Sequence, residues 1–279
     1  MPVKRNVCTV VFACFLFLAI GLLSMSAEAA PNQYGCTEKP IRVGYFKLGY
    51  RFYVENGQEK GMNVDILEEF KKRTGCSFTT QEMTFARIWA DLASGQLDMS
   101  LSGIRSPERD KTLWCAESIT SKNFVVIGTA ANKAGVRNPD QFLSNGKLVF
   151  GVVRGYTHGK MQDAWLQKMR QAGRVEESAN TDILFEKLKQ GRIDGIFAFP
   201  FVYRKLIGEL GLKDAVTVQD WFPSDKGIIG CTMMPKSRFS QAEADRWQLL
   251  IRQMQKDGTL KRIFTRYVST SEADQMLDF

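Results

Sequence analysis

Apolar and polar positions from residue 41 onward alternate between strand-type and helix-type runs. Strand-type runs over 41–46, 76–80 and 97–101 enclose two amphipathic segments, a helix from Met62 to a glycine stop at Gly75 and a helix over 85–93. Apolar residues three and four apart are typical of helices, and short apolar runs bounded by turn residues are typical of strands. Strand, helix, strand, helix, strand in this order predicts a parallel α/β unit.

A second unit of the same kind follows a strand at 123–128 and a small, polar boundary at 130–138. Its strands and helices alternate over 148–153, 160–172, the vicinity of Val175, 181–190 and 193–199. The sequence Leu-Ala-Ser-Gly-Gln-Leu-Asp at 92–98 returns as Leu-Lys-Gln-Gly-Arg-Ile-Asp at 188–194, which is a weak internal repeat. A further strand at 226–234 and helices over 241–267, broken at Gly258, complete the pattern.

Two such units with a helical return predict two lobes, each a doubly wound sheet flanked by helices. The C-terminal segment is expected to pack back on the first lobe. Ligands of open α/β sheets bind at the carboxyl ends of the strands, so a ligand site is expected between the lobes.

The first 29 residues have the pattern of an export signal. Lys4 and Arg5 precede an apolar stretch over 10–23, and Ser26-Ala27-Glu28-Ala29-Ala30 offers small residues for cleavage after Ala29. An uncleaved membrane anchor would need a longer apolar span. The residues before Cys14 do not suit a lipoprotein signal. The mature chain is therefore expected in the periplasm.

Removal of the signal lowers the formal net charge from +8 to +7. Because the basic residues are dispersed, nucleic-acid binding is not expected, whereas small anionic partners are compatible with this charge. His158 is the only histidine and no Cys-x-x-Cys is present, so neither a metal nor a cofactor is expected.

Four of the six cysteines remain in the mature chain and allow three disulfide pairings. Cys36 and Cys76 precede the first two strands, whose starts are neighbours at one sheet edge. We therefore prefer Cys36–Cys76, which leaves Cys115–Cys231.

The segment Ser102-Gly103-Ile104-Arg105-Ser106-Pro107-Glu108-Arg109 follows a predicted strand and opens a short helix. Small residues with exposed backbone N–H groups beside two arginines suit a carboxylate or another small anion. The alternative is a solvated loop in which the arginines pair with Glu108 and Asp110.

Several ordered motifs resemble the solute-binding proteins of bacterial amino-acid ABC transporters, which have the type II periplasmic binding fold. They are Ile41-Arg42-Val43-Gly44, Gly61-Met62-Asn63-Val64-Asp65 after Asn56-Gly57, the 92–98 and 188–194 segments, Ser102-Gly103 to Arg109, and Gln255-Lys256-Asp257-Gly258-Thr259-Leu260. The resemblance implies hinge strands near 124–130 and 226–231. It implies a first lobe of 30–126 plus 228–279 and a second lobe of 127–227. Its partners would be an inner-membrane permease and a small ligand that a monomer clamps between its lobes.

The resemblance also assigns roles to single residues. Arg109 matches the arginine that grips a ligand carboxylate, Ser106 stands in for a threonine that helps it, and Ser102 and Gly103 match backbone contacts. Gly155-Tyr156-Thr157 matches the loop of the second lobe, with Thr157 as a carboxylate donor and His158 beside it. Tyr50, Phe52 and Phe85 match aromatic residues of the pocket wall.

Three departures from the family pattern alter the expected ligand. Tyr50-Arg51 replaces a Pro-Pro pair. The motif loop after Gly103 is shorter than in the family, which brings Arg105 close to the expected ligand site. Phe199 stands where the family has the aspartate that binds an amino group. An α-ammonium group would then be buried without a partner, at a cost of several kcal/mol. The expected ligand is a carboxylate or other anion with an apolar or aromatic body, rather than a standard amino acid.

Two alternative functions share this fold. A dehydratase of cyclic dienyl acids would need a general acid, for which His158 and Glu108 are the candidates. A ligand sensor would report to a membrane receptor.

Overall fold

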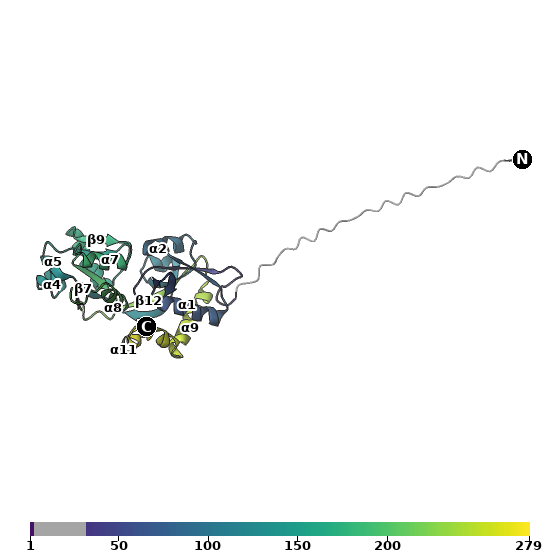
Figure 1. Cartoon of the computed structure of the whole chain (residues 1–279). Coiled ribbons are helices and arrows are strands. Elements are labelled where there is room, and N and C mark those ends of the chain that lie inside the picture. Colours follow the sequence, from purple (N-terminus) through teal and green to yellow (C-terminus); the bar gives the residue numbers. More distant parts are fainter. Residues whose placement is uncertain (3–31) are drawn as a thin grey trace.

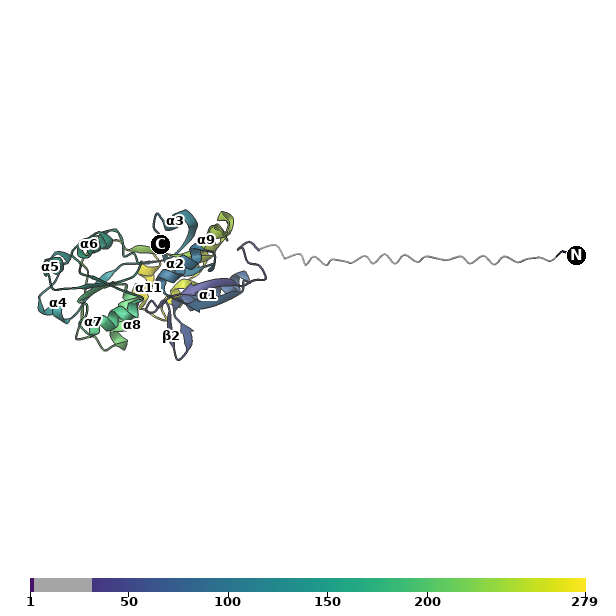
Figure 2. The same cartoon turned by 90° about the horizontal axis from the view of Figure 1, so that it is seen from above.

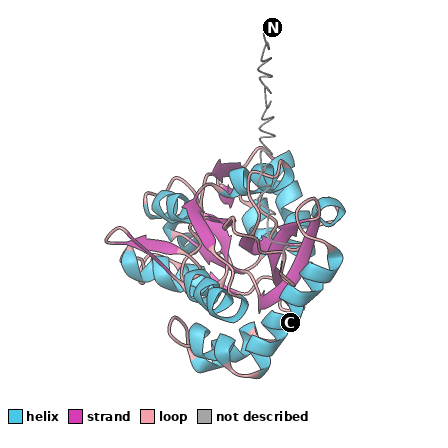
Figure 3. Cartoon of the chain, turned by 90° about the vertical axis from the view of Figure 1, so that its right-hand side faces the viewer, coloured by secondary structure: helices cyan, strands magenta, loops and turns pink. Residues whose placement is uncertain are grey.

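The computed structural model describes residues 1–2 and 32–279, so the predicted export signal lies outside the described residues apart from its first two. Its α/β elements form two bodies (Figures 1 and 2). Strands occupy the interior of the molecule and helices lie around them (Figure 3). No helix in the described ranges is long and apolar enough to cross a membrane.

The first lobe is built on a mixed sheet. β1 (Ile41–Tyr45) pairs in parallel with β4 (Phe78–Glu82), and a Val43–Met99 bridge joins β1 to the segment that enters β5 (Ser100–Ile104). β12 (Ile228–Pro235) runs antiparallel between β5 and β6 (Leu113–Ser121). The remaining elements of this lobe are a hairpin and six helices: β2 (Tyr53–Glu55), β3 (Gln58–Lys60), α1 (Met62–Thr74), α2 (Phe85–Ala93), α3 (Arg109–Thr112), α9 (Gln241–Lys256), α10 (Thr259–Phe264) and α11 (Thr270–Met276).

The second lobe contains one five-stranded sheet in the order β11-β7-β10-β8-β9. These strands are β7 (Phe124–Ile127), β8 (Phe150–Val153), β9 (Val175–Ser178), β10 (Gly195–Ala198) and β11 (Thr217–Gln219). Its helices are α4 (Thr129–Lys133), α5 (Pro139–Ser144), α6 (Lys160–Gln171), α7 (Thr181–Lys189) and α8 (Pro200–Glu209). An aromatic core of Phe142, Phe150, Trp165, Phe197 and Trp221 fills the space beneath this sheet.

Most predicted elements are present, with shifted ends. α1 ends at Gly75, which has a left-handed φ of 71°, as the glycine stop predicted. The strand predicted at 97–101 lies at Ser100–Ile104, because β12 pairs with β5 as far as Ile104. Ser102 and Gly103 therefore belong to the strand itself and not to the loop after it.

The internal repeat has a structural counterpart in two aspartates. The carboxylate of Asp98 accepts the backbone N–H of Arg42 at 2.9 Å, and that of Asp194 accepts the backbone N–H of Val149 at 2.8 Å. Asp98 thus joins the segment that enters β5 to the start of β1, and Asp194 joins the start of β10 to the start of β8. The two lobes share one folding pattern at this point.

The chain passes between the lobes twice, and the two crossings lie side by side. β6 leads into β7 through Lys122, and β11 leads into β12 through 220–227; the Lys122 ammonium lies 2.7 Å from the Asp220 carboxylate. All four residues of β7 pair within the sheet of the second lobe. All of β7 therefore belongs to the sheet of the second lobe.

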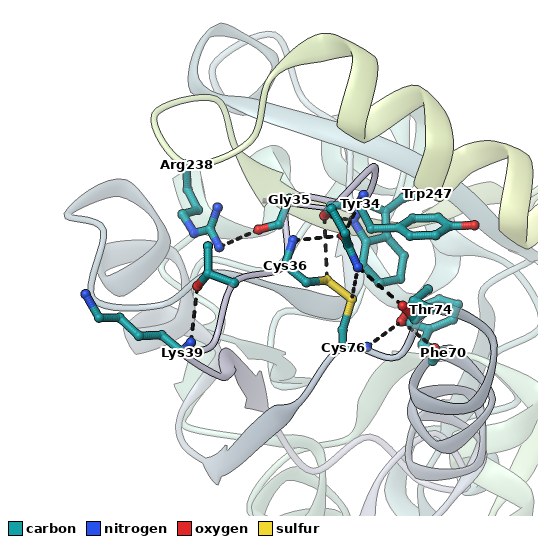
Figure 4. Close-up of a disulfide and its surroundings, with 11 residues drawn as sticks. Tyr34, Gly35, Cys36, Lys39, Phe70, Thr74, Cys76, Arg238 and Trp247 are labelled. Carbon is teal, nitrogen blue, oxygen red and sulfur yellow. Dashed lines mark hydrogen bonds between the residues drawn. A yellow bond between two sulfur atoms is a disulfide. The ribbon is translucent and has the colours of Figure 1, made fainter. Parts of the chain in front are cut away.

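Both preferred cysteine pairs are close enough to form disulfides, and both lie in the first lobe. Cys36 and Cys76 have Cα atoms 5.6 Å apart, and Cys115 and Cys231 have Cα atoms 5.3 Å apart. Around the first pair, the Trp247 indole donates to the carbonyl of Tyr34 (Figure 4). The disulfide ties the N-terminal segment to the residues between α1 and β4, and the Trp247 hydrogen bond holds the same segment against α9.

The two aspartates of the repeat differ electrostatically, which makes a matched test possible. Burial alone would raise the pKa of Asp98, but hydrogen bonds from the Arg42 side chain and backbone lower it below its usual value. Burial raises the pKa of Asp194, and the hydrogen bond from the Val149 N–H partly offsets this shift.

We expect Asp98→Asn to lower the free energy of unfolding by about 2–3 kcal/mol at pH 7. We expect Asp194→Asn to change it by less than about 1 kcal/mol, since a neutral amide oxygen still accepts the Val149 N–H.

The pH dependence of chemical denaturation checks this pair. A carboxylate with a lowered native pKa stabilises above its unfolded-state pKa of about 4 and loses that contribution as the pH falls through the native value. The deficit of Asp98→Asn should therefore shrink below pH 4. A deficit that is constant from pH 7 to pH 3 would contradict the ion-pair assignment.

Candidate functional site

A small cavity lies where the two lobes meet. The first lobe contributes Leu48, Arg51, Ser102, Gly103 and Ile104, and the second contributes Tyr156, Phe199 and Phe201. Ile119, Ser121, Ile228 and Gly230 come from the two strands that lead to the crossings. The cavity is thus at the place between the lobes where the sequence predicted a ligand.

Arg51 is the single charged residue that lines this cavity. Its side chain is buried, with 2% of the residue exposed, and its Nη2 donates to the carbonyl of Leu101 at 2.5 Å. Its Nη1 is buried without a hydrogen-bond partner among the described residues. Burial lowers the pKa of Arg51 to about 10, so the guanidinium remains charged at neutral pH.

The described residues that line the cavity include no aspartate, glutamate or histidine. Phe199 begins α8 as its N-cap residue and stacks on Phe201 with ring centroids 5.2 Å apart. At the position where the resemblance predicts a carboxylate, the wall is therefore aromatic. An ammonium group placed here would have no counter-charge and would meet the guanidinium of Arg51.

Arg109 joins the two lobes. Its guanidinium donates to the carbonyl of Ile104 at 2.9 Å and, across the interface, to the carbonyl of Gly155 at 3.2 Å. It also lies 3.8 Å above the ring of Trp89, within cation–π distance. Burial lowers its pKa, and it does not line the cavity.

Aromatic side chains close one side of the interface next to Arg109. Tyr156 of the second lobe packs on Phe85 with ring centroids 4.8 Å apart and lies 6.5 Å from Phe46. Burial raises the pKa of the Tyr156 phenol, so it stays neutral and can donate a hydrogen bond. Phe85 is fully buried and reaches the cavity only through Tyr156.

A backbone contact closes the opposite side of the interface. The N–H of Tyr50 donates to the carbonyl of Phe201 at 2.9 Å. Gly49 has a left-handed φ of 55°, and a Cβ built on it would lie 2.3 Å from the same carbonyl oxygen. Only glycine allows the two lobes to approach this closely here.

Four of the predicted ligand contacts line the cavity, namely Ser102, Gly103, Tyr156 and Phe199. The Ser102 hydroxyl accepts a hydrogen bond from Asn63 at 2.7 Å, which orients it and leaves its own proton for another acceptor. The remaining contacts predicted from the sequence lie elsewhere.

Two of those residues are engaged within the motif loop. Arg105 is paired with Asp110 at 2.9 Å and is more than half exposed, as the solvated-loop alternative predicted for it. The Ser106 hydroxyl accepts the backbone N–H of Arg109 at 3.3 Å. Neither residue lines the cavity.

Besides Phe85 and Arg109, which are described above, four more predicted contacts lie outside the cavity lining. Tyr50 packs near Tyr267, and Phe52 is fully buried against Tyr45 in the core of the first lobe. Thr157 is half-buried beside the lining residue Tyr156. His158 is buried, with its Nδ1 3.6 Å from the Asp163 carboxylate and its ring near Phe197.

Among the lining residues that the prediction of the site omitted, Arg51 is the charged one. The signal was present in the sequence, because a charged residue stands between two aromatic residues where the related proteins carry proline. Among the described residues, no group of three or more His, Cys, Asp or Glu side chains could hold a metal ion.

The two lobes, the double crossing and the cavity between them define a bacterial solute-binding protein. The chain belongs to the bacterial extracellular solute-binding proteins, family 3, whose sequence profile matches residues 41–270. No curated protein matches the sequence.

Several solved structures have the same fold. An ancestral arginine-binding protein bound to arginine superposes with a TM-score of 0.68 at 20% identity, covering 82% of this chain and 98% of that one. The arginine-, lysine-, histidine-binding protein ArtJ from Geobacillus stearothermophilus has a TM-score of 0.68 at 18% identity, covering 85% and 100%. An ancestral amino-acid-binding protein that is a precursor of cyclohexadienyl dehydratase has a TM-score of 0.66 at 20% identity, covering 82% and 95%. At these identities the likeness shows the fold.

Substitution of Gly49 tests the close approach of the lobes. Gly49→Ala and Gly57→Ala both place alanine at a left-handed φ, which costs about 1 kcal/mol of stability. Only the Gly49 variant adds a clash across the interface, since nothing lies within 4 Å of a Cβ at Gly57. We expect a larger radius of gyration by small-angle X-ray scattering for Gly49→Ala alone. Equal radii for the two variants would show that this contact does not limit closure.

Proposed function

We propose that this protein binds a small carboxylate-bearing or other anionic solute between its lobes and delivers it to an ABC permease of the inner membrane. It would act as a monomer in the periplasm, after cleavage of the export signal. The ligand would not be a standard α-amino acid. The observation that carries this proposal is the cavity, which contains one buried guanidinium and no carboxylate.

The physical basis is the high free-energy cost of burying unpaired charge. A zwitterionic amino acid would bring a carboxylate, which Arg51 can pair, and an ammonium group, for which the lining offers no anion. A carboxylate with an apolar body avoids this penalty. Its anionic end would meet Arg51, Ser102 and the backbone at Gly103, and its body would meet Tyr156 and Phe199.

The relatives bear on the choice between binding and catalysis. One structural neighbour is an ancestral amino-acid-binding protein that is a precursor of cyclohexadienyl dehydratase. This relationship supports the enzyme as the alternative function for the fold. The general acids considered for it lie away from the cavity: Glu108 is exposed, and His158 is packed in the second lobe. A turnover assay with a prephenate-like acid separates the two, because a binding protein saturates without forming product.

A thermal-shift screen of the purified mature protein tests the ligand class. We expect aromatic and branched-chain carboxylic acids to raise the unfolding temperature and standard amino acids to have no effect, because a ligand that binds the folded state stabilises it. At a hundredfold excess over Kd the stabilisation is about 2.7 kcal/mol. A common amino acid bound with micromolar affinity, undiminished in Phe199→Asp, would contradict the proposal.

Phe199 offers the matched variants for this screen. We expect Phe199→Asp to abolish the response to acids, since the new carboxylate pairs with Arg51 and repels an anionic ligand. Phe199→Leu keeps the wall apolar and should retain the response within about tenfold, the scale of a lost aromatic contact. Isothermal titration calorimetry of both variants measures the difference. Equal loss in both would assign Phe199 a packing role only.

A further inference from the structure

The positive charge of the buried Arg51 guanidinium is not balanced by a negative group among the described residues. The described structure pairs it with no carboxylate, and the polar contact it makes is the hydrogen bond from Nη2 to the carbonyl of Leu101. The other end of the guanidinium, Nη1, is buried without a hydrogen-bond partner among the described residues, and Arg51 lines the cavity. A buried ion without a counter-ion is strongly unfavourable unless another group supplies the missing charge.

Arg109 also pairs with no carboxylate among the described residues, but its guanidinium has more partners than that of Arg51. Its guanidinium is occupied by two backbone carbonyls, those of Ile104 and Gly155, and by the ring of Trp89. One of these bonds reaches the other lobe, so it forms only when the lobes are together. Arg109 is therefore placed to stabilise the closed arrangement.

The rest of the lining limits what can accompany an anionic group. The walls around Arg51 are mainly apolar, with Leu48, Ile119, Phe199 and Phe201 among them. With one cationic side chain in the lining, the cavity suits a single negative charge. The apolar character of the remaining lining suits an apolar ligand body.

We propose that Arg51, and not Arg109, is the anchor for the anionic group of the ligand, and that Arg109 is a latch between the lobes. The ligand is then a monoanion, a carboxylate on a compact aromatic or branched aliphatic body. This rests on the proposed function, since it assigns a role within the same cavity.

Paired acids and amides separate an anchor from a latch. The probes are benzoate with benzamide, phenylacetate with phenylacetamide, and 3-methylbutanoate with 3-methylbutanamide, titrated calorimetrically into the purified mature protein. The native protein should prefer each acid that binds over its amide by roughly 10- to 100-fold, the scale of a charge-assisted hydrogen bond. In Arg51→Met this preference should fall to within about threefold. In Arg109→Met acid and amide should weaken by the same factor and the preference should persist.

Further variants keep the test independent of folding defects. Arg51→Lys retains the charge without the planar fork and should keep an intermediate preference. The exposed Arg192→Met removes a positive charge away from the cavity and should change nothing. Arg51→Met should also unfold at a temperature close to that of the native protein, because it removes an unpaired buried charge.

The outcomes distinguish this inference from the function on which it rests. If no acid of the panel binds the native protein, the proposed function fails and the inference with it. If acids bind and Arg51→Met keeps their preference over amides, the inference alone is wrong. If the preference is lost in Arg109→Met and kept in Arg51→Met, Arg109 is the anchor.

Discussion

The antiparallel pairing of β12 with β5 and β6 is the constraint on which the rest of the molecule depends. β12 returns the chain from the second lobe and completes the sheet of the first, pairing with β6 from Ile228 to Pro235. The same pairing brings Cys231 beside Cys115. It also sets two walls of the cavity, because Ile228 and Gly230 on β12 face the ligand space together with Ile119 and Ser121 on β6. Without β12 the sheet of the first lobe is incomplete, and the cavity lacks the lining that Ile228 and Gly230 provide.

The positive charge of the cavity lining comes from Arg51, whose position is set by the backbone around it. Arg51 lies in the turn between β1 and β2, and backbone contacts hold this turn on both sides. Its N–H donates to Leu48, and its carbonyl accepts from Asn63 at the start of α1. The guanidinium is thus positioned by main-chain bonds and by Leu101. Under the proposed function, this arginine would select for the charge of the ligand and the aromatic walls for its shape.

Local patterns predicted the elements whose residues carry their own signals. α1 has apolar residues at helical spacing, a basic last turn and Gly75 at its end, and each of these features is present in the structure. β6 was not predicted, because its burial does not alternate regularly and its pairing with β12 shifts register between Gly230 and Cys231. A strand defined by a bulge and by a partner more than a hundred residues away has no clear local periodicity.

The same distinction applies to the site. Ser102, Gly103, Tyr156 and Phe199 were predicted from motif positions, and they line the cavity. Arg51 was noticed as a departure and not as a contact, because its direction depends on how the turn at 48–51 packs against β5. Phe52 was predicted as a stacking residue, but it lies in the core against Tyr45. Residue type and position indicate which segments meet; tertiary packing decides which side chain reaches the ligand space.

The Cys115–Cys231 pair has a consequence for the order in which the parts of the chain fold. These cysteines are 116 positions apart and enclose every strand and helix of the second lobe. The second lobe is continuous and can form as soon as it has emerged, whereas the first must wait for β12 and the three helices behind it. The first lobe therefore contains the first strands and helices to be synthesised but completes its folding after the second lobe. The covalent link between its two parts can form only after the inserted lobe has been made.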